Sequence, residues 1–119
     1  MMKLFFTAIK GYWLLLTFVI LIAIGVLSLT PLEQLPEVPG SDKTHHFIAY
    51  AALAFPVAFA RPKQWLFFIF GFLAYSGLIE LLQPYVNRYG ELLDMVANSA
   101  GLVIGVTVAY LINRFHFKE

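Results

Sequence analysis

Four long apolar segments, separated by short polar stretches, dominate the pattern of this chain. They cover residues 12–29, 44–60, 65–83 and 92–112. A helix needs about 20 largely apolar residues to cross about 30 Å of hydrocarbon, and three of the segments come close to that length. The pattern predicts an all-α membrane protein, a bundle of four transmembrane helices in a single domain of residues 1–119.

The second segment is the shortest, and two histidines, His45 and His46, lie in its first turn. A re-entrant segment is therefore an alternative at 44–60. The first segment follows Lys3 and Lys10, as the apolar region of a signal peptide would. It is longer than the roughly 7–15 residues of such a region and no Ala-x-Ala-like site follows it, so we expect it to remain as a helix.

Composition agrees with a membrane protein. Hydrophobic residues make up 61% of the chain and charged residues 13%, against about 45–50% and about 25% in soluble domains. The net charge of +1, with no long basic run, argues against a nucleic-acid partner. The chain has no cysteine, which excludes disulfides, thiolate metal sites and cysteine nucleophiles.

The basic residues predict the orientation. With four crossings, one side of the membrane receives only Lys43 and Arg88. The other side receives Lys3, Lys10, Arg61, Lys63, Arg114 and Lys118. Short cytoplasmic segments carry the excess of lysine and arginine, so both termini are predicted to be cytoplasmic. The re-entrant alternative would weaken this bias.

Polar residues of three predicted helices gather at the opposite, extracytoplasmic end. At 1.5 Å per residue, Glu80 lies roughly 22 Å from Trp65 and within about 8 Å of the outer boundary. The candidate catalytic residues are Glu80, His46 and Asp94, and the candidate ligand-binding residues are Asp42, Lys43, Gln83, Arg88 and Asn98.

Glu80 and Asp94 carry most of this prediction. A carboxylate at the centre of a transmembrane helix costs about 2.5–3.5 kcal/mol, and such groups usually have a function. The alternative is an ion-pair network that only fixes the helices. No cofactor is predicted. A divalent metal held by Asp42, His46, Glu80 and Asp94 is a less favoured variant, because no metal-binding spacing such as HExxH is present.

The last apolar segment carries a GxxxG motif, Gly101 and Gly105. Such a motif lets a second helix approach closely. Packing within the chain is the favoured interpretation, and an oligomer formed through these glycines is the alternative.

Two blocks of residues resemble the VanZ-like family of membrane proteins. The first is Asp42-Lys43-Thr44-His45-His46-Phe47 with Tyr50. The second is Glu80-Leu-Leu-Gln83, Arg88, then Asp94 to Asn98, Gly101 and Gly105. The resemblance implies a bacterial cytoplasmic-membrane protein and, through the founding member, a link with resistance to the glycopeptide teicoplanin. It implies no established catalytic mechanism.

These observations favour a pocket at the extracytoplasmic face that binds or modifies an amphiphile of the cell envelope, either a lipid or a lipid-linked precursor. Lys43 and Arg88 would hold its headgroup, and Glu80 or His46 would act as general base. The alternatives are a non-catalytic membrane subunit and a small transporter. Transporter sites, however, tend to lie at the bilayer midplane.

Overall fold

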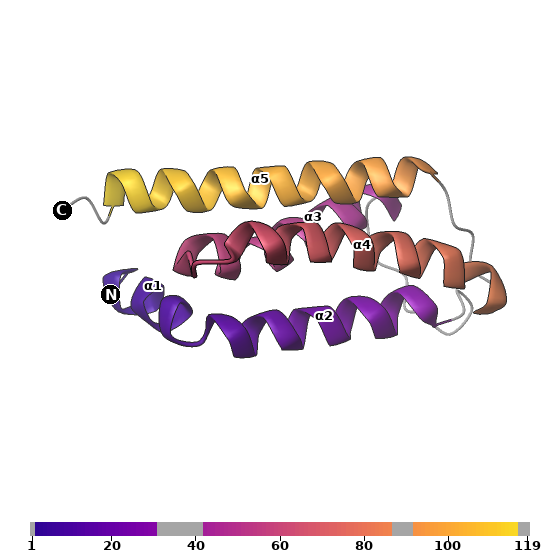
Figure 1. Cartoon of the computed structure of the whole chain (residues 1–119), viewed down its shortest axis with the longest axis horizontal. Helices are drawn as coiled ribbons and strands as arrows, with labels where there is room; N and C mark the ends of the chain where they lie inside the picture. The colour runs from indigo at the N-terminus through magenta and orange to yellow at the C-terminus, as the bar shows by residue number, and fades with distance from the viewer. Residues whose placement is uncertain (1, 31–41, 87–91, 117–119) are drawn as a thin grey trace.

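The computed structural model describes residues 2–30, 42–86 and 92–116, and all of its regular structure is helical (Figure 1). Each predicted apolar segment forms a helix. The elements in chain order are α1 (Met2–Gly11), α2 (Trp13–Leu29), α3 (Asp42–Ala60), α4 (Trp65–Leu82), the short 3-10 helix η2 (Gln83–Val86) and α5 (Leu92–His116).

The four long helices lie side by side along the length of an elongated bundle of 49 × 27 × 22 Å (Figure 1). Helices α3 and α5 begin at the end of the bundle where α2 and α4 finish, so their directions alternate along the chain. Helix α1 and the last turn of α5 lie at the other end of the bundle. This arrangement brings the starts of α3 and α5 close to the last turns of α4, where the candidate site residues are.

Helix α1 is a fifth helix that the apolar pattern does not predict. It packs on α3 through the ring of Phe6, whose centroid is 5.3 Å from that of Phe59, and the Lys10 ammonium lies 4.9 Å above the same Phe59 ring. The chain bends by 77° between α1 and α2. Lys3 and Lys10 make the segment look like a polar flank, but its apolar side chains are sufficient for one face of a helix.

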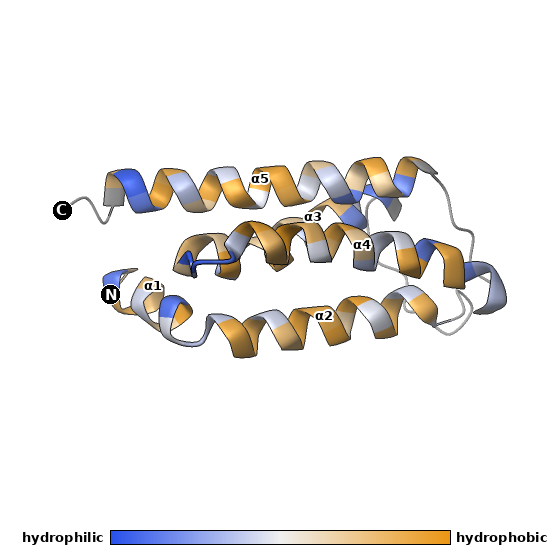
Figure 2. Cartoon of the chain, viewed as in Figure 1, coloured by the Kyte–Doolittle hydropathy of each residue, from blue (hydrophilic) through white to orange (hydrophobic). Residues whose placement is uncertain are grey.

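Two helical stretches are long and apolar enough to cross a membrane, Trp65–Tyr85 and Leu93–Phe115. Helices α1 and α2 add a third if the bent pair is one span. Figure 2 shows the corresponding hydrophobic bands along α2, α4 and α5. The chain is thus a helical membrane protein with two to three candidate spans, where the sequence predicted four.

Among the described helices, α3 meets this criterion neither alone nor together with a neighbouring helix, and its position explains why. It packs against α1, α2, α4 and α5, and its contact with α5 is the most extensive in the bundle. Leu53, Ala54 and Val57 are fully buried, and Tyr50 and Phe59 nearly so. A helix surrounded by other helices does not need an all-round apolar surface, so α3 tolerates Lys43 and the two histidines at its start.

Gly101 and Gly105 face α3 of the same chain. A Cβ atom at Gly101 would collide with the backbone carbonyl of Phe47 and lie 3.1 Å from the nitrogen of Ala51. At Gly105 it would collide with the carbonyl of Ala51 and lie 3.0 Å from the Cβ of Ala54. The two helix backbones are therefore in direct contact, and a second copy could use this glycine face only if α3 left it.

Candidate functional site

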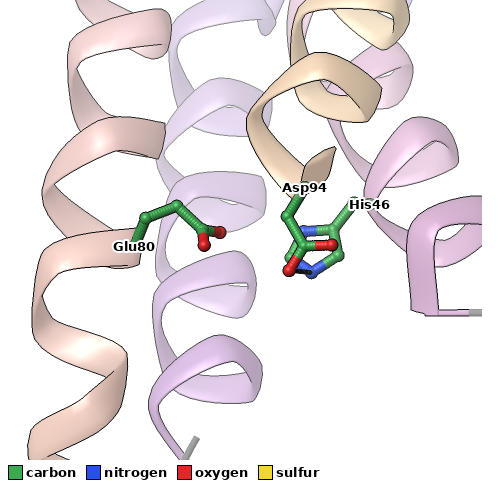
Figure 3. Close-up of side chains that lie close together, drawn as sticks. All are labelled: His46, Glu80 and Asp94. Atoms are coloured by element: carbon green, nitrogen blue, oxygen red, sulfur yellow. Dashed lines mark ion pairs between the residues drawn. The ribbon is translucent and has the colours of Figure 1, made fainter. Parts of the chain in front are cut away.

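Three helices bring an imidazole and two carboxylates together near one end of the bundle. His46 comes from the second turn of α3, Glu80 from the end of α4 and Asp94 from the first turn of α5. One ligand atom from each lies within 4.8 Å of the other two. Figure 3 shows the Glu80 carboxylate extending from α4 toward the pair formed by Asp94 and His46. The three predicted catalytic residues thus converge although 48 positions separate His46 from Asp94.

Asp94 is the centre of the group, with 2% of its side chain exposed. Its Oδ2 lies 3.9 Å from Nε2 of His46, and its Oδ1 lies 3.9 Å from Nζ of Lys43. The Lys43 side chain is 43% exposed, so its ammonium lies at the rim of the group. Because Lys43 and His46 are three residues apart on one helix, they share a face, and both reach Asp94 from α3.

Asp94 lies near the N-terminal end of α5. It occupies the first turn of the helix, where the unsatisfied backbone N–H groups and the helix dipole favour a negative charge by about 0.3–1 kcal/mol. The same carboxylate in the middle of α5 would lack this support. Its position therefore combines burial with electrostatic stabilisation.

A second polar layer lies one helical turn deeper. Asn98 follows Asp94 by one turn on α5, and Ser76 precedes Glu80 by one turn on α4. The Asn98 Nδ2 donates a hydrogen bond of 2.6 Å to the Ser76 hydroxyl, which is also hydrogen-bonded to Tyr50. Among the described residues the Asn98 Oδ1 accepts no hydrogen bond, although the residue is only 1% exposed.

Gln83 connects the site to α2. It follows Glu80 by one turn, in η2, and its Nε2 donates a hydrogen bond of 3.0 Å to the backbone carbonyl of Ser28 in the last turn of α2. Its Oε1 is buried and accepts no hydrogen bond within the described part of the chain. Ser28 is a site neighbour that sequence reasoning missed. Because the acceptor is a backbone carbonyl, which every residue has, no signal in the sequence could have identified it.

The remaining predicted residues are less fully defined. Asp42 begins α3, but its side chain lies outside the described structure. Arg88, the second predicted headgroup ligand, also lies outside the described residues, as does Glu91. Tyr50, which belongs to the first block of residues that resembles the VanZ-like family, is 1% exposed and joins the deeper polar layer through Ser76.

The group has the atoms for two kinds of chemistry. Glu80, Asp94 and neutral His46 can each accept a proton from a bound molecule, and the protonated forms can return it. The same three side chains offer two oxygen ligands and one nitrogen ligand for a divalent cation. Lys43 at the rim provides a positive charge for an anionic group.

A separate recess of about 210 Å³ lies between α3, α4 and α5 near the other end of the bundle. It is lined by Ala58, Arg61, Trp65, Val106, Thr107 and Tyr110. Among the described residues, no carboxylate or imidazole lines this recess, which distinguishes it from the His46–Glu80–Asp94 group.

Comparison with known proteins identifies the family of the chain. No curated protein and no solved structure matches it. The VanZ/LLP1 family model matches residues 1–113, which include every helix up to the last turn of α5 and all of the residues that form the polar site. The chain therefore belongs to the VanZ/LLP1 family.

Proposed function

We propose that the chain crosses the bacterial cytoplasmic membrane four times, with both termini in the cytoplasm. In support, α3 has 19 residues, or about 28 Å at 1.5 Å per residue, close to the thickness of the hydrocarbon core. It runs alongside α5, which meets the criterion for a span. The distribution of lysine and arginine then places the His46–Glu80–Asp94 group at the extracytoplasmic face.

We further propose that this group binds the headgroup of an envelope amphiphile, a lipid or a lipid-linked precursor, and takes part in its modification. The observation that carries the proposal is that Asp94, at 2% exposure, lies with His46 and Glu80 within one 4.8 Å group built from three helices. Burying ionisable groups in a membrane is costly, and such groups commonly mark a functional site.

The proposed roles follow the depth of each residue. Lys43, exposed at the rim, meets the phosphate or carboxylate of the headgroup. Glu80, which is half-buried, or His46 acts as general base on a headgroup hydroxyl or a water molecule. The apolar surfaces of α2, α4 and α5 remain in contact with the acyl chains.

The test is complementation of a strain that lacks the gene. Wild type, Glu80→Gln, Asp94→Asn, His46→Ala and a control, Asn113→Ala, are expressed at equal levels, and the envelope lipids are compared by mass spectrometry. Asn113 is a suitable control because it is a polar residue that joins two helices, α5 and α3, through a hydrogen bond to the carbonyl of Phe59, but at the other end of the bundle. We expect the three site variants to resemble the empty vector and Asn113→Ala to resemble wild type.

The proposal fails if all three site variants restore the wild-type lipid profile while their protein accumulates normally. It also fails if Asn113→Ala loses the profile to the same extent, because the effect would then not belong to the site.

A second candidate is a non-catalytic membrane subunit, favoured by the bonds that the polar residues make between helices. Asp94 joins α5 to α3, and Asn98 joins α5 to α4. If this is their role, Glu80→Gln and Asp94→Asn lower the amount of folded protein. The proposed site instead requires folded variants that have lost their effect on the envelope.

A further inference from the structure

The His46–Glu80–Asp94 group has the composition of a mixed nitrogen and oxygen metal site. Two of its residues are nearly inaccessible, His46 at 8% and Asp94 at 2%. The three ligand atoms come from three helices, so the fold and not a local loop sets their separation. One imidazole with two carboxylates suits Mn²⁺ or Zn²⁺ better than Ca²⁺, which prefers oxygen ligands alone.

The separations are close to those that a bound ion requires. Two ligands about 2.1 Å from a tetrahedral ion are about 3.4 Å apart. The His46–Asp94 pair, at 3.9 Å, would have to close by about 0.5 Å, and the widest pair by at most about 1.4 Å. Changes of this size are within the reach of small side-chain rotations of His46, Asp94 and Glu80, whose side chain has three rotatable bonds.

Lys43 leaves room for a cation. Its ammonium lies near Oδ1 of Asp94, whereas His46 lies near Oδ2. An ion between His46 and Glu80 would therefore bind Oδ2, and Lys43 could keep its position on the other oxygen. Two carboxylates in one buried group are a favourable setting for a divalent cation, which would be the largest charge in the site.

A second observation points to a ligand in the same place. Asn98 lies between the same two helices as Glu80 and Asp94 and one turn below Asp94. Its Oδ1 is buried and accepts no hydrogen bond from the described residues, whereas its nitrogen is held by Ser76. Buried amide oxygens usually have a partner. A cation, or a water molecule bound to one, would supply it.

We propose that His46, Glu80 and Asp94 bind one divalent cation, Mn²⁺ or Zn²⁺. The inference rests on the site of the proposed function and deepens it, because the cation would bind the phosphate of the headgroup from within the bundle while Lys43 meets it from the rim. Asn98 completes the site by accepting a hydrogen bond from a water ligand. Mutation of such supporting residues typically weakens metal affinity about 10–100-fold.

Metal content tests this proposal directly. The protein is purified without a polyhistidine tag, stripped with a chelator, equilibrated with Mn²⁺ or Zn²⁺ and analysed by mass spectrometry of the elements. We expect one ion per wild-type chain, retention of the ion in the matched control His45→Ala, and its loss in His46→Ala, Glu80→Gln and Asp94→Asn. His45 is the adjacent residue of α3 and is not one of the three grouped residues.

Pulsed electron paramagnetic resonance of the Mn²⁺-loaded wild type gives a second measurement that does not depend on any variant being folded. We expect modulation from one directly bound imidazole nitrogen. The proposal is overturned if the wild type retains no ion, if His45→Ala loses the ion as His46→Ala does, or if the spectrum shows no bound nitrogen.

The two proposals fail separately. If the wild type binds one ion but the site variants restore the envelope lipids, the proposed function is wrong and the metal site stands. If the wild type binds no ion but the site variants lose the lipid profile, the metal proposal is wrong and the headgroup site stands.

Discussion

Replacing Gly101 or Gly105 with alanine tests how closely α3 and α5 are packed and whether this packing sets the geometry of the polar site. A Cβ at Gly101 collides with the Phe47 carbonyl, and a Cβ at Gly105 collides with the Ala51 carbonyl. Backbone atoms cannot rotate away as a side chain does. The two helices, which form the most extensive contact in the bundle, must therefore move apart.

Two opposing effects determine the magnitude. An extra methyl group in a well-packed interior costs about 1–3 kcal/mol. The upper value applies here because at both glycines the added Cβ meets a backbone carbonyl of α3. Alanine recovers about 1 kcal/mol because it favours the helix over the unfolded chain more than glycine does. We expect each variant to lose about 2 kcal/mol of unfolding free energy.

Gly71 of α4 is the matched control, because a Cβ there meets nothing within 4 Å. Gly71→Ala should gain up to about 1 kcal/mol, so the two kinds of variant should differ by about 3 kcal/mol. Unfolding by sodium dodecyl sulfate in mixed micelles, followed by circular dichroism, measures this difference. If Gly101→Ala and Gly105→Ala are as stable as Gly71→Ala, the described contact between α3 and α5 is incorrect.

The same variants also report on the site. Phe47 directly follows His46 in α3, so movement of its carbonyl away from α5 widens the 3.9 Å separation between His46 and Asp94. Gly101→Ala should therefore weaken metal binding more than Gly105→Ala, which lies one turn farther from the site. Equal weakening by both would show that the loss comes from general destabilisation.

Two further predictions concern the topology and the packing of α2. Because the chain has no cysteine, Tyr85→Cys should react with a membrane-impermeant maleimide on intact cells and Lys63→Cys only after lysis, and the reverse result would contradict the proposed orientation. Gly25→Ala places a methyl group 2.6 Å from the Tyr75 hydroxyl. The substitution should therefore destabilise the wild-type protein but have almost no effect on stability in the Tyr75→Phe background. A double-mutant cycle measures the coupling energy, expected to be about 0.5–3 kcal/mol, and additive effects would refute the contact.

Much of the bundle could be predicted from the sequence because long apolar runs mark the helices and the polar residues are concentrated near one end of them. The apolar runs around α2, α4 and α5 are visible to any hydropathy count, and Pro31 and Pro84 mark where they stop. The polar convergence was predictable for a similar reason. Few places in a membrane accept a carboxylate. Glu80 and Asp94 both lie near the same end of the bundle, so they were expected to share one polar site.

Other features depend on packing partners and could not be obtained in this way. Helix α1 is stabilised by contacts of Phe6 and Lys10 with Phe59, a residue more than 45 positions away along the chain. The hydrogen bond of Gln83 to the backbone carbonyl of Ser28 likewise carries no signal in the sequence. In both cases the interaction joins two segments that lie far apart in the sequence and come close together only when the chain folds.

Helix α3 shows how these observations are related. It is the least lipophilic of the predicted spans because its neighbours, and not the membrane, bury it. That shielding is also what lets it carry Lys43 and His46 at the level where α5 begins and α4 ends. A helix facing lipid could not hold these side chains without a large cost in free energy. The property that weakens α3 as a candidate span therefore makes it suitable to supply the ammonium group of Lys43 and the imidazole of His46. The glycine face of α5 brings α3 close enough for both groups to reach Asp94.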